Sequence, residues 1–231
     1  IKPYADKMQQ IIETVGKSLS YSINSPLYNS RNEGKTLVIL VTSNKGLCGV
    51  FNASVTRKAI DWAKNERAAE LSKDNLVFFT IGKKGHDVLS KLHFQILGKE
   101  DNLIHKPSFE FSAFFVKRLV KGYLEREYKE VVVFYNSFKN AASQKVVMEN
   151  FLPIAMPEMK NESPTNFVLE PNPEVILHEL APKMLEMQFH KVILDSLASE
   201  HGARMTAMHK ATDNATDLIY SLKLTYNKAR Q

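Results

Sequence analysis

Cysteine and long apolar runs are scarce in this chain of 231 residues. It has one cysteine, Cys48, and no run of about eighteen apolar residues. The single cysteine excludes an internal disulfide framework and fits a reducing compartment. The missing apolar run excludes a transmembrane segment of helical type. A content of 44% hydrophobic residues, with 13 phenylalanines, still suffices for a sizeable core.

The common motifs of nucleotide and metal sites are also missing. In the segment Thr42–Val50 (TSNKGLCGV), Gly46 and Gly49 lie three apart, a spacing found in neither the dinucleotide fingerprint nor the P-loop. We expect both glycines to serve a tight turn and close helix packing. Cys48 is expected to be a small buried side chain, because no histidine is placed to act as its base. No histidine begins a zinc-protease pattern, so we predict no catalytic residue, no metal and no cofactor.

The charge points to an acidic partner. The formal net charge is +6, which favours binding to nucleic acid, anionic lipid or acidic protein. A single-stranded nucleic-acid groove needs aromatic residues interleaved with lysine and arginine, and the sequence has no such cluster. We therefore expect an acidic protein partner and no nucleic acid.

The middle of the chain alternates strand and helix patterns. Continuous aliphatic runs of this kind are typical of strands buried on both faces of a parallel sheet. The alternation predicts an α/β fold, a Rossmann-like and mostly parallel sheet with helices on both faces. Strands are expected at 36–42, 76–81, 94–97 and 130–135, helices at 52–72, 85–92 and 108–123, and edge strands at 145–148 and 166–169.

Proline and glycine nearly disappear from the last fifty residues, where Pro182 and Gly202 are the only ones. A helix of that length reaches roughly 75 Å at about 1.5 Å per residue, beyond the diameter of a domain this size. Its apolar residues recur at the 3.5-residue period of a coiled coil. This seam, which we call the C-terminal seam, consists of Met208, Ala211, Ala215, Leu218, Leu222, Thr225 and Ala229.

The opening of the chain carries the same spacing at Tyr4, Met8, Ile11, Val15 and Leu19. We expect the two ends to pair as an antiparallel coiled coil, with the sheet domain inserted between its arms. The expected domains are an N-terminal arm at 1–23, a Rossmann-like domain at 35–171 and a long C-terminal helix at 172–231. Neither end has a capping residue, so the coiled coil is expected to continue in both directions.

Several separated motifs together resemble the gamma subunit of F-type ATP synthase. They are Pro3–Ala5 (PYA), Thr42–Gly49 (TSNKGLCG), Ser199–Met208 (SEHGARMTAM), Ala211–Ala215 (ATDNA) and Leu224–Gln231 (LTYNKARQ). Agreement of motifs from both ends and the core on one family makes the resemblance specific. It implies a sequence without the outer ends of the family's shaft. The lone Cys48 is unlike the family's chloroplast members, which carry further cysteines.

The resemblance implies a central rotor shaft that couples proton flow through a membrane ring to ATP synthesis at the beta subunits, without chemistry of its own. The implied partners are the alpha and beta subunits, the epsilon subunit and the proteolipid c-ring. Lys228, Arg230 and Gln231 match the segment that contacts the beta subunits, and Phe189, His190 and Lys191 match the foot on the ring and epsilon. The implied location is peripheral, on the cytoplasmic face of the bacterial plasma membrane or, alternatively, the matrix face of the mitochondrial inner membrane. An α/β enzyme that binds a nucleotide or acyl substrate at the turn 43–49 remains the alternative function.

Overall fold

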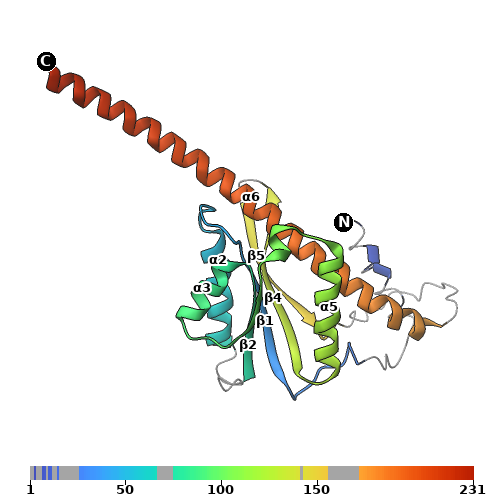
Figure 1. Ribbon diagram of the computed structural model, residues 1–231. Helices are drawn as coiled ribbons and strands as arrows, with labels where there is room; N and C mark the ends of the chain where they lie inside the picture. Colours follow the sequence, from blue (N-terminus) through green and yellow to red (C-terminus); the bar gives the residue numbers. More distant parts are fainter. Residues whose placement is uncertain are drawn as a thin grey trace.

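The computed structural model describes residues 26–66, 75–140, 143–155 and 172–231, and six positions nearer the start: Pro3, Lys7, Met8, Gln10, Ile11 and Val15. Figure 1 shows a central sheet flanked by helices, with one long helix that extends far beyond it. The expected edge strand at 166–169 and most of the N-terminal arm lie outside the described residues.

The sheet has five strands in the order β3-β2-β1-β4-β5. The first four run parallel, and β5 pairs antiparallel with β4. The expectation of a mostly parallel sheet is therefore confirmed. The strands are β1 (Lys35–Val41), β2 (Leu76–Ile81), β3 (Ile96–Glu100), β4 (Tyr128–Asn140) and β5 (Ser143–Leu152).

Both faces of the central strands are buried, which explains their unbroken apolar sequences. In β1, Leu37, Ile39 and Val41 belong to one buried cluster, whereas Val38 and Leu40 belong to another. Successive strand residues point to opposite faces, so a strand covered on both sides needs apolar residues at every position.

Each face is covered by its own pair of helices (Figure 1). On one side lie α2 (Phe51–Asp61), which continues as a π-helical turn, η1 (Trp62–Glu66), and α3 (Lys83–Lys91). On the other side lie α5 (Phe109–Leu124) and the first half of α6 (Pro173–Arg230). A short helix, α4 (Asn102–His105), connects β3 to the segment before α5.

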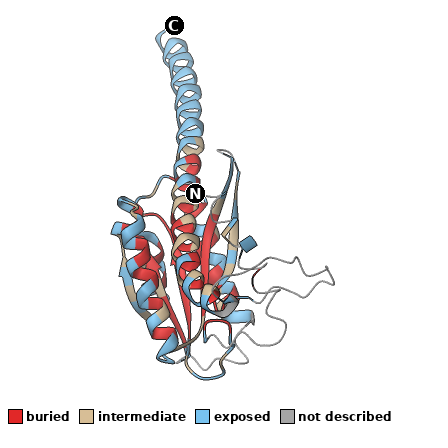
Figure 2. Cartoon of the chain, turned by 90° about the vertical axis from the view of Figure 1, so that its right-hand side faces the viewer, coloured by how far each residue is buried: buried red, intermediate tan, exposed pale blue. Residues whose placement is uncertain are grey.

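The long helix α6 has two unlike halves (Figure 2). Its first half packs on the sheet and on α5, with Leu177, Leu185, Phe189 and Ile193 buried. Every residue from Met208 onward is exposed. The helix therefore leaves the domain near Ala207 and continues with its apolar seam uncovered by any described residue.

The paired arms of a coiled coil are not seen in the described residues. Val15 is buried in the same cluster as Leu177 and Ala181, and Met8 packs against that cluster. These N-terminal positions thus belong to the core of the domain and do not cover the C-terminal seam, with which we expected them to pair, because every residue of that seam is exposed.

Candidate functional site at the junction of a turn and the long helix

The turn after β1 occupies the place where open α/β sheets bind their ligands. In such sheets a crevice forms outside the carboxyl ends of the strands, where the strand order reverses. Here the order reverses between β1 and β4. The turn Thr42–Val50 follows β1, and Asn136 lies in β4 beside it, so this is the first place to look for a site.

The polar groups of the turn bond to one another. The backbone N–H of Ser43 donates to Asn52 Oδ1 at 2.9 Å, and Ser43 Oγ donates to the Lys45 carbonyl at 2.5 Å. The Asn52 amide donates back to Ser43 Oγ at 2.8 Å and to Cys48 Sγ at 3.2 Å. This local network fixes the turn against the start of α2.

A second set of contacts joins the turn to its neighbours. Asn44 donates from Nδ2 to the Asp101 carbonyl at 2.8 Å and accepts from the Lys83 N–H at 3.0 Å. The side chain of Asn136 donates to the Phe51 carbonyl at 3.2 Å. The turn is thus tied to β4, to the start of α3 and to the segment after β3.

The helix α6 crosses this corner and packs directly on the turn (Figure 1). Ala203 forms a small buried cluster with Cys48 and Phe51. Nε and Nη2 of Arg204 each lie 3.4 Å from the carbonyl oxygen of Gly46, and Nη2 is 2.6 Å from a carboxylate oxygen of Glu200. The chain's own helix therefore fills the place that a ligand takes in related sheets.

The two glycines of the turn differ in their geometry. Gly49 has φ +58°, and a Cβ there would lie 4.0 Å from Cβ of Ala207 on α6. The expected role in a tight turn against a helix is therefore met at Gly49. Gly46 has no positive φ, and a Cβ there would meet only the end of the Lys84 side chain at 4.0 Å. The expectation of a conformational need for glycine at 46 is thus not supported, because what α6 uses there is the carbonyl oxygen.

Cys48 is buried, as the sequence indicated, with 2% of its surface exposed. Its sulfur contacts Ser43 and Asn52. Neither is a histidine, so no general base is positioned against the thiol by these contacts. Among the described residues no group of three or more His, Cys, Asp or Glu side chains is arranged to hold a metal ion.

Polar contacts also anchor α6 to the sheet below the turn. Ser199 Oγ donates to the Asn136 carbonyl at 3.0 Å, and Ser137 Oγ donates to Asp195 at 3.2 Å. Because hydrogen bonds need a defined geometry, these contacts fix the rotation of α6 about its own axis. An apolar interface alone would leave that rotation less specified.

Two of the residues matched to the family's foot are buried in this structure. Phe189 has no exposed surface and stacks on Phe115 with 5.0 Å between ring centroids. His190 is also buried and places Nδ1 3.0 Å from Ser112 Oγ on α5. Both side chains fasten α6 to the domain, so neither offers surface to another subunit. Lys191 is half-buried.

The residues matched to the beta-subunit contact lie at the far end of α6. Lys228 and Arg230 are exposed in the last turn, and Gln231 follows it. Cations in the last helical turn are favoured by the helix dipole. They are free of the domain, since the whole stretch from Met208 is exposed.

This junction is also built by residues that the sequence did not predict for it: Asn52, Asn136 and the pair Glu200–Arg204. The sequence does carry a pattern for Asn136 and for the pair Glu200–Arg204. Asn136 is the first polar residue after the apolar run of β4, and Glu200 and Arg204 have the i, i+4 spacing of a helical ion pair. Asn52 carries no comparable pattern.

Comparison with known proteins places this chain in one family. The family model described as ATP synthase matches residues 1–231. The ATP synthase gamma chain of Flavobacterium johnsoniae is 44% identical over 234 residues, covering all of this chain and 79% of the relative. That of Geotalea uraniireducens is 40% identical over 232 residues, with the same two coverages.

Solved structures agree on the fold. The rotor of the Euglena gracilis mitochondrial ATP synthase aligns with a TM-score of 0.64 at 19% identity, over 99% of this chain and 93% of that one. The central stalk of the Tetrahymena thermophila mitochondrial enzyme gives 0.57 at 20% identity, over 90% of this chain and 99% of that one. Because a family model matches it from end to end and curated relatives match at about 40% identity, the chain belongs to the family of ATP synthase gamma chains.

Proposed function

We propose that this chain is the central rotor shaft of a proton-translocating F-type ATP synthase. It couples proton flow through the membrane ring to ATP synthesis or hydrolysis at the beta subunits. The chain performs no chemistry. Its asymmetric surface favours different beta-subunit conformations at different angles, and such differential contact is what shifts a conformational equilibrium.

The exposed half of α6 is the observation that carries this proposal. A helix with an apolar seam buries too little area to be stable alone in water, so it needs a cover. The stretch from Met208 to Arg230 projects from a domain that does not cover it. The hollow of an alpha–beta hexamer is the cover that family membership supports.

The charges at the C-terminal end of α6 suggest which subunits it contacts. Lys228 and Arg230 are exposed cations and Gln231 is a neutral polar neighbour, suited to acidic loops of the beta subunits. For the c-ring and epsilon contact we retain Lys191 alone of the three residues matched to the foot. A direct contact through Phe189 or His190 is withdrawn because both are buried.

The proposed organisation is an N-terminal arm at 1–23, a Rossmann-like domain at 35–171 and the shaft helix at 172–231, with the domain inserted in the antiparallel pair. Every helix in the described part of the chain is too short or too polar to span a membrane. We propose a peripheral position on the cytoplasmic face of a bacterial plasma membrane. The bacterial sources of the curated relatives favour it over the mitochondrial matrix face.

The test is binding to the alpha–beta hexamer by the full chain and by a chain that ends at Ala207. Because the removed residues are all exposed, the shortened chain should keep its melting temperature and lose only the helical circular dichroism of the residues removed. We expect the full chain to co-elute with the hexamer and the shortened chain to lose binding by at least tenfold. Equal binding of the two would contradict the role assigned to the projecting helix.

The alternative, a nucleotide-binding enzyme, depends on free polar groups at the turn 43–49. Ser43 and Asn44 are bonded within the protein, and the Gly46 carbonyl faces Arg204. Saturable binding of ATP or NAD that is lost on replacing Asn44 by alanine would restore that alternative.

A further inference from the structure

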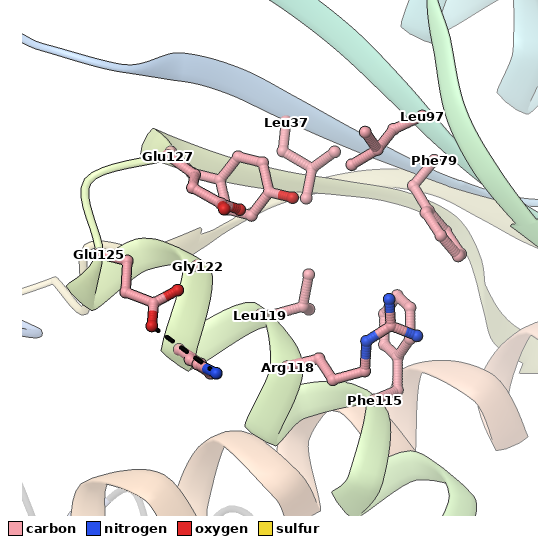
Figure 3. A pocket seen from close by; sticks show the side chains of 11 residues that line it. Leu37, Phe79, Leu97, Phe115, Arg118, Leu119, Gly122, Glu125 and Glu127 are labelled. Carbon is pink, nitrogen blue, oxygen red and sulfur yellow. Dashed lines mark ion pairs between the residues drawn. The ribbon is translucent and has the colours of Figure 1, made fainter.

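A cavity of about 470 Å³ lies at the other end of the sheet, between α5 and the amino-terminal parts of the strands (Figure 3). Leu37 of β1, Phe79 of β2 and Leu119 of α5 line it with apolar surface, and Leu97 of β3 stands at its rim. Ligand pockets in proteins usually measure about 300–1,000 Å³. The volume therefore suits a small molecule.

Two glycines shape the walls of this cavity. A Cβ at Gly122 would lie 2.6 Å from Cε2 of Tyr128, and one at Gly98 would lie 2.9 Å from Cε2 of Phe79. Both distances are far below van der Waals contact. Glycine at these positions therefore lets the Tyr128 ring lie directly on Gly122 and the Phe79 ring directly on Gly98. The two rings that border the cavity are held by this close packing.

Two polar groups on the cavity wall have no partner among the described residues. Neither the Arg118 guanidinium nor the Tyr128 hydroxyl makes a hydrogen bond or ion pair with any residue that the structure describes. By contrast, Lys121 at the rim pairs with Glu125 at 3.7 Å, the contact dashed in Figure 3. An arginine and a phenol without partners offer several N–H donors and one O–H donor.

The electrostatics keep the phenol a donor. Burial and the nearby Glu127 raise the pKa of Tyr128 above its ordinary value, against a smaller lowering by Arg118. Tyr128 is thus uncharged at neutral pH. Figure 3 shows Arg118 beside Phe115 and across the cavity from Glu127, so one side of the opening is cationic and the other anionic.

We propose that this cavity binds an amphiphile with a single carboxylate on an apolar chain. Arg118 binds the carboxylate through its planar fork, which matches a carboxylate in geometry, and Tyr128 donates a hydrogen bond to it. The chain lies on Leu37, Phe79 and Leu119. The exposed Glu127 at the rim opposes a second negative charge, so a carboxylate is favoured over a phosphate dianion.

The test is titration of the purified chain with laurate below its micelle concentration, at neutral pH and low salt, followed by calorimetry and by the amide resonance of Gly122. We expect saturation at one laurate per chain. Dodecanol, which lacks the charge, should bind at least fivefold more weakly, and dodecyltrimethylammonium, with the opposite charge, more weakly still.

Variants separate this site from general adsorption. Arg118→Gln should weaken laurate binding about tenfold and Tyr128→Phe about threefold, because the first removes a charged donor to the carboxylate and the second a neutral one. Glu127→Gln should strengthen it. The matched control is Lys117→Gln, an exposed cation on the same helix that does not line this cavity, and it should leave affinity within twofold.

Three results would overturn the proposal. The first is no saturable laurate binding by the folded chain. The second is equal affinity of wild type and Arg118→Gln, and the third is tighter binding of the cationic amphiphile than of laurate. Circular dichroism of each variant shows whether it is folded, and Arg118, Lys117 and Glu127 are all exposed, so their replacement leaves the core intact.

Discussion

Single residues of the turn show how position decides what glycine does. Gly49 adopts φ +58°, a conformation that costs a residue with a side chain about 1 kcal/mol or more. Gly46 lies outside that region, and a Cβ there would meet only Cε of Lys84, at 4.0 Å. The sequence alone therefore does not show that only Gly49 of the two requires glycine for its backbone conformation.

We predict that Gly49→Val lowers the free energy of unfolding by about 1–3 kcal/mol, because a β-branched side chain is strained at positive φ. Gly46→Ala should change it by less than about 0.5 kcal/mol. Urea denaturation of both variants beside wild type measures this. A destabilised Gly46→Ala with an unaffected Gly49→Val would reverse our assignment of the two positions.

His190 gives stability a dependence on pH. Ser112 Oγ has one proton, which it donates to the Ser108 carbonyl at 3.0 Å, so the Nδ1–H of neutral His190 donates to Ser112 Oγ. Burial lowers the pKa of His190 below its usual range. Below pH 6.5 the unfolded chain takes up a proton that the folded chain resists. The contribution to stability is therefore full above about pH 6.5 and declines as the pH falls through that value.

The variant His190→Gln should lose this decline. We expect the free energy of unfolding to fall between pH 7.5 and 5.5 in wild type, and to fall less in the variant. Chemical denaturation at several pH values is the measurement, and Gln keeps a side-chain amide that can still contact Ser112. Parallel pH profiles for the two proteins would show that His190 is not the titrating group.

At the scale of elements, α6 is one helix with two kinds of stability. Its first half is held by buried apolar contacts and by hydrogen bonds to β4. Its second half relies on itself: the hydroxyls of Thr212, Thr216 and Thr225 donate to the carbonyls four residues earlier. Side-chain bonds of this kind give little stability to a helix.

We predict slow amide exchange from about Leu177 to Ala203 and fast exchange from Met208 to Arg230 in the isolated chain, since exposed helical hydrogen bonds open locally. Exchange followed by mass spectrometry resolves the two segments. Binding to the alpha–beta hexamer should slow exchange in the second segment and leave the first unchanged. Uniform protection to Arg230 in a free monomer would mean that the chain covers its own seam.

The strands and helices with strong periodicity could be predicted from the sequence, whereas their junctions could not. β1 and β2 match their expected ranges to within a residue because burial on both faces demands unbroken apolar runs. β3 begins two residues later than expected and runs to Glu100, with Leu97 and Lys99 exposed. β5 is longer than its apolar part. The contact of Arg204 with Gly46 joins residues 158 positions apart, and no local pattern encodes such a pairing.

In the whole molecule, one part holds the long helix α6 in place and another part presents its exposed surface. The sheet domain holds the first half of α6 in a fixed rotation, and the exposed half carries its cations away from the domain (Figure 2). A shaft that passes its rotation to other subunits must be held rigidly at one part and must expose a surface at another. The contacts of Ser199, Asn136 and Arg204 hold the helix in a fixed position. The free surface is the part of α6 beyond Met208.

We predict that Arg230→Ala lowers the number of protons pumped per ATP hydrolysed in the assembled complex, because it removes an exposed cation that we propose contacts the beta subunits. The isolated domain should stay folded, because Arg230 is exposed and far from the core. Proton uptake by membrane vesicles per ATP hydrolysed is the measurement, with Lys223→Ala as the control on the same helix. Loss of folding with full coupling would mean that the role of Arg230 is structural.

Direct observation of rotation tests the central claim. Cys48 is the chain's one cysteine and is buried, so a second cysteine at the exposed Lys91 of α3, on the side of the sheet away from α6, can take a bead selectively. In complexes fixed to a surface through the hexamer, addition of ATP should turn the bead in one direction. Steady ATP hydrolysis with a stationary bead, in complexes shown to contain the labelled chain, would contradict a rotor role for this protein.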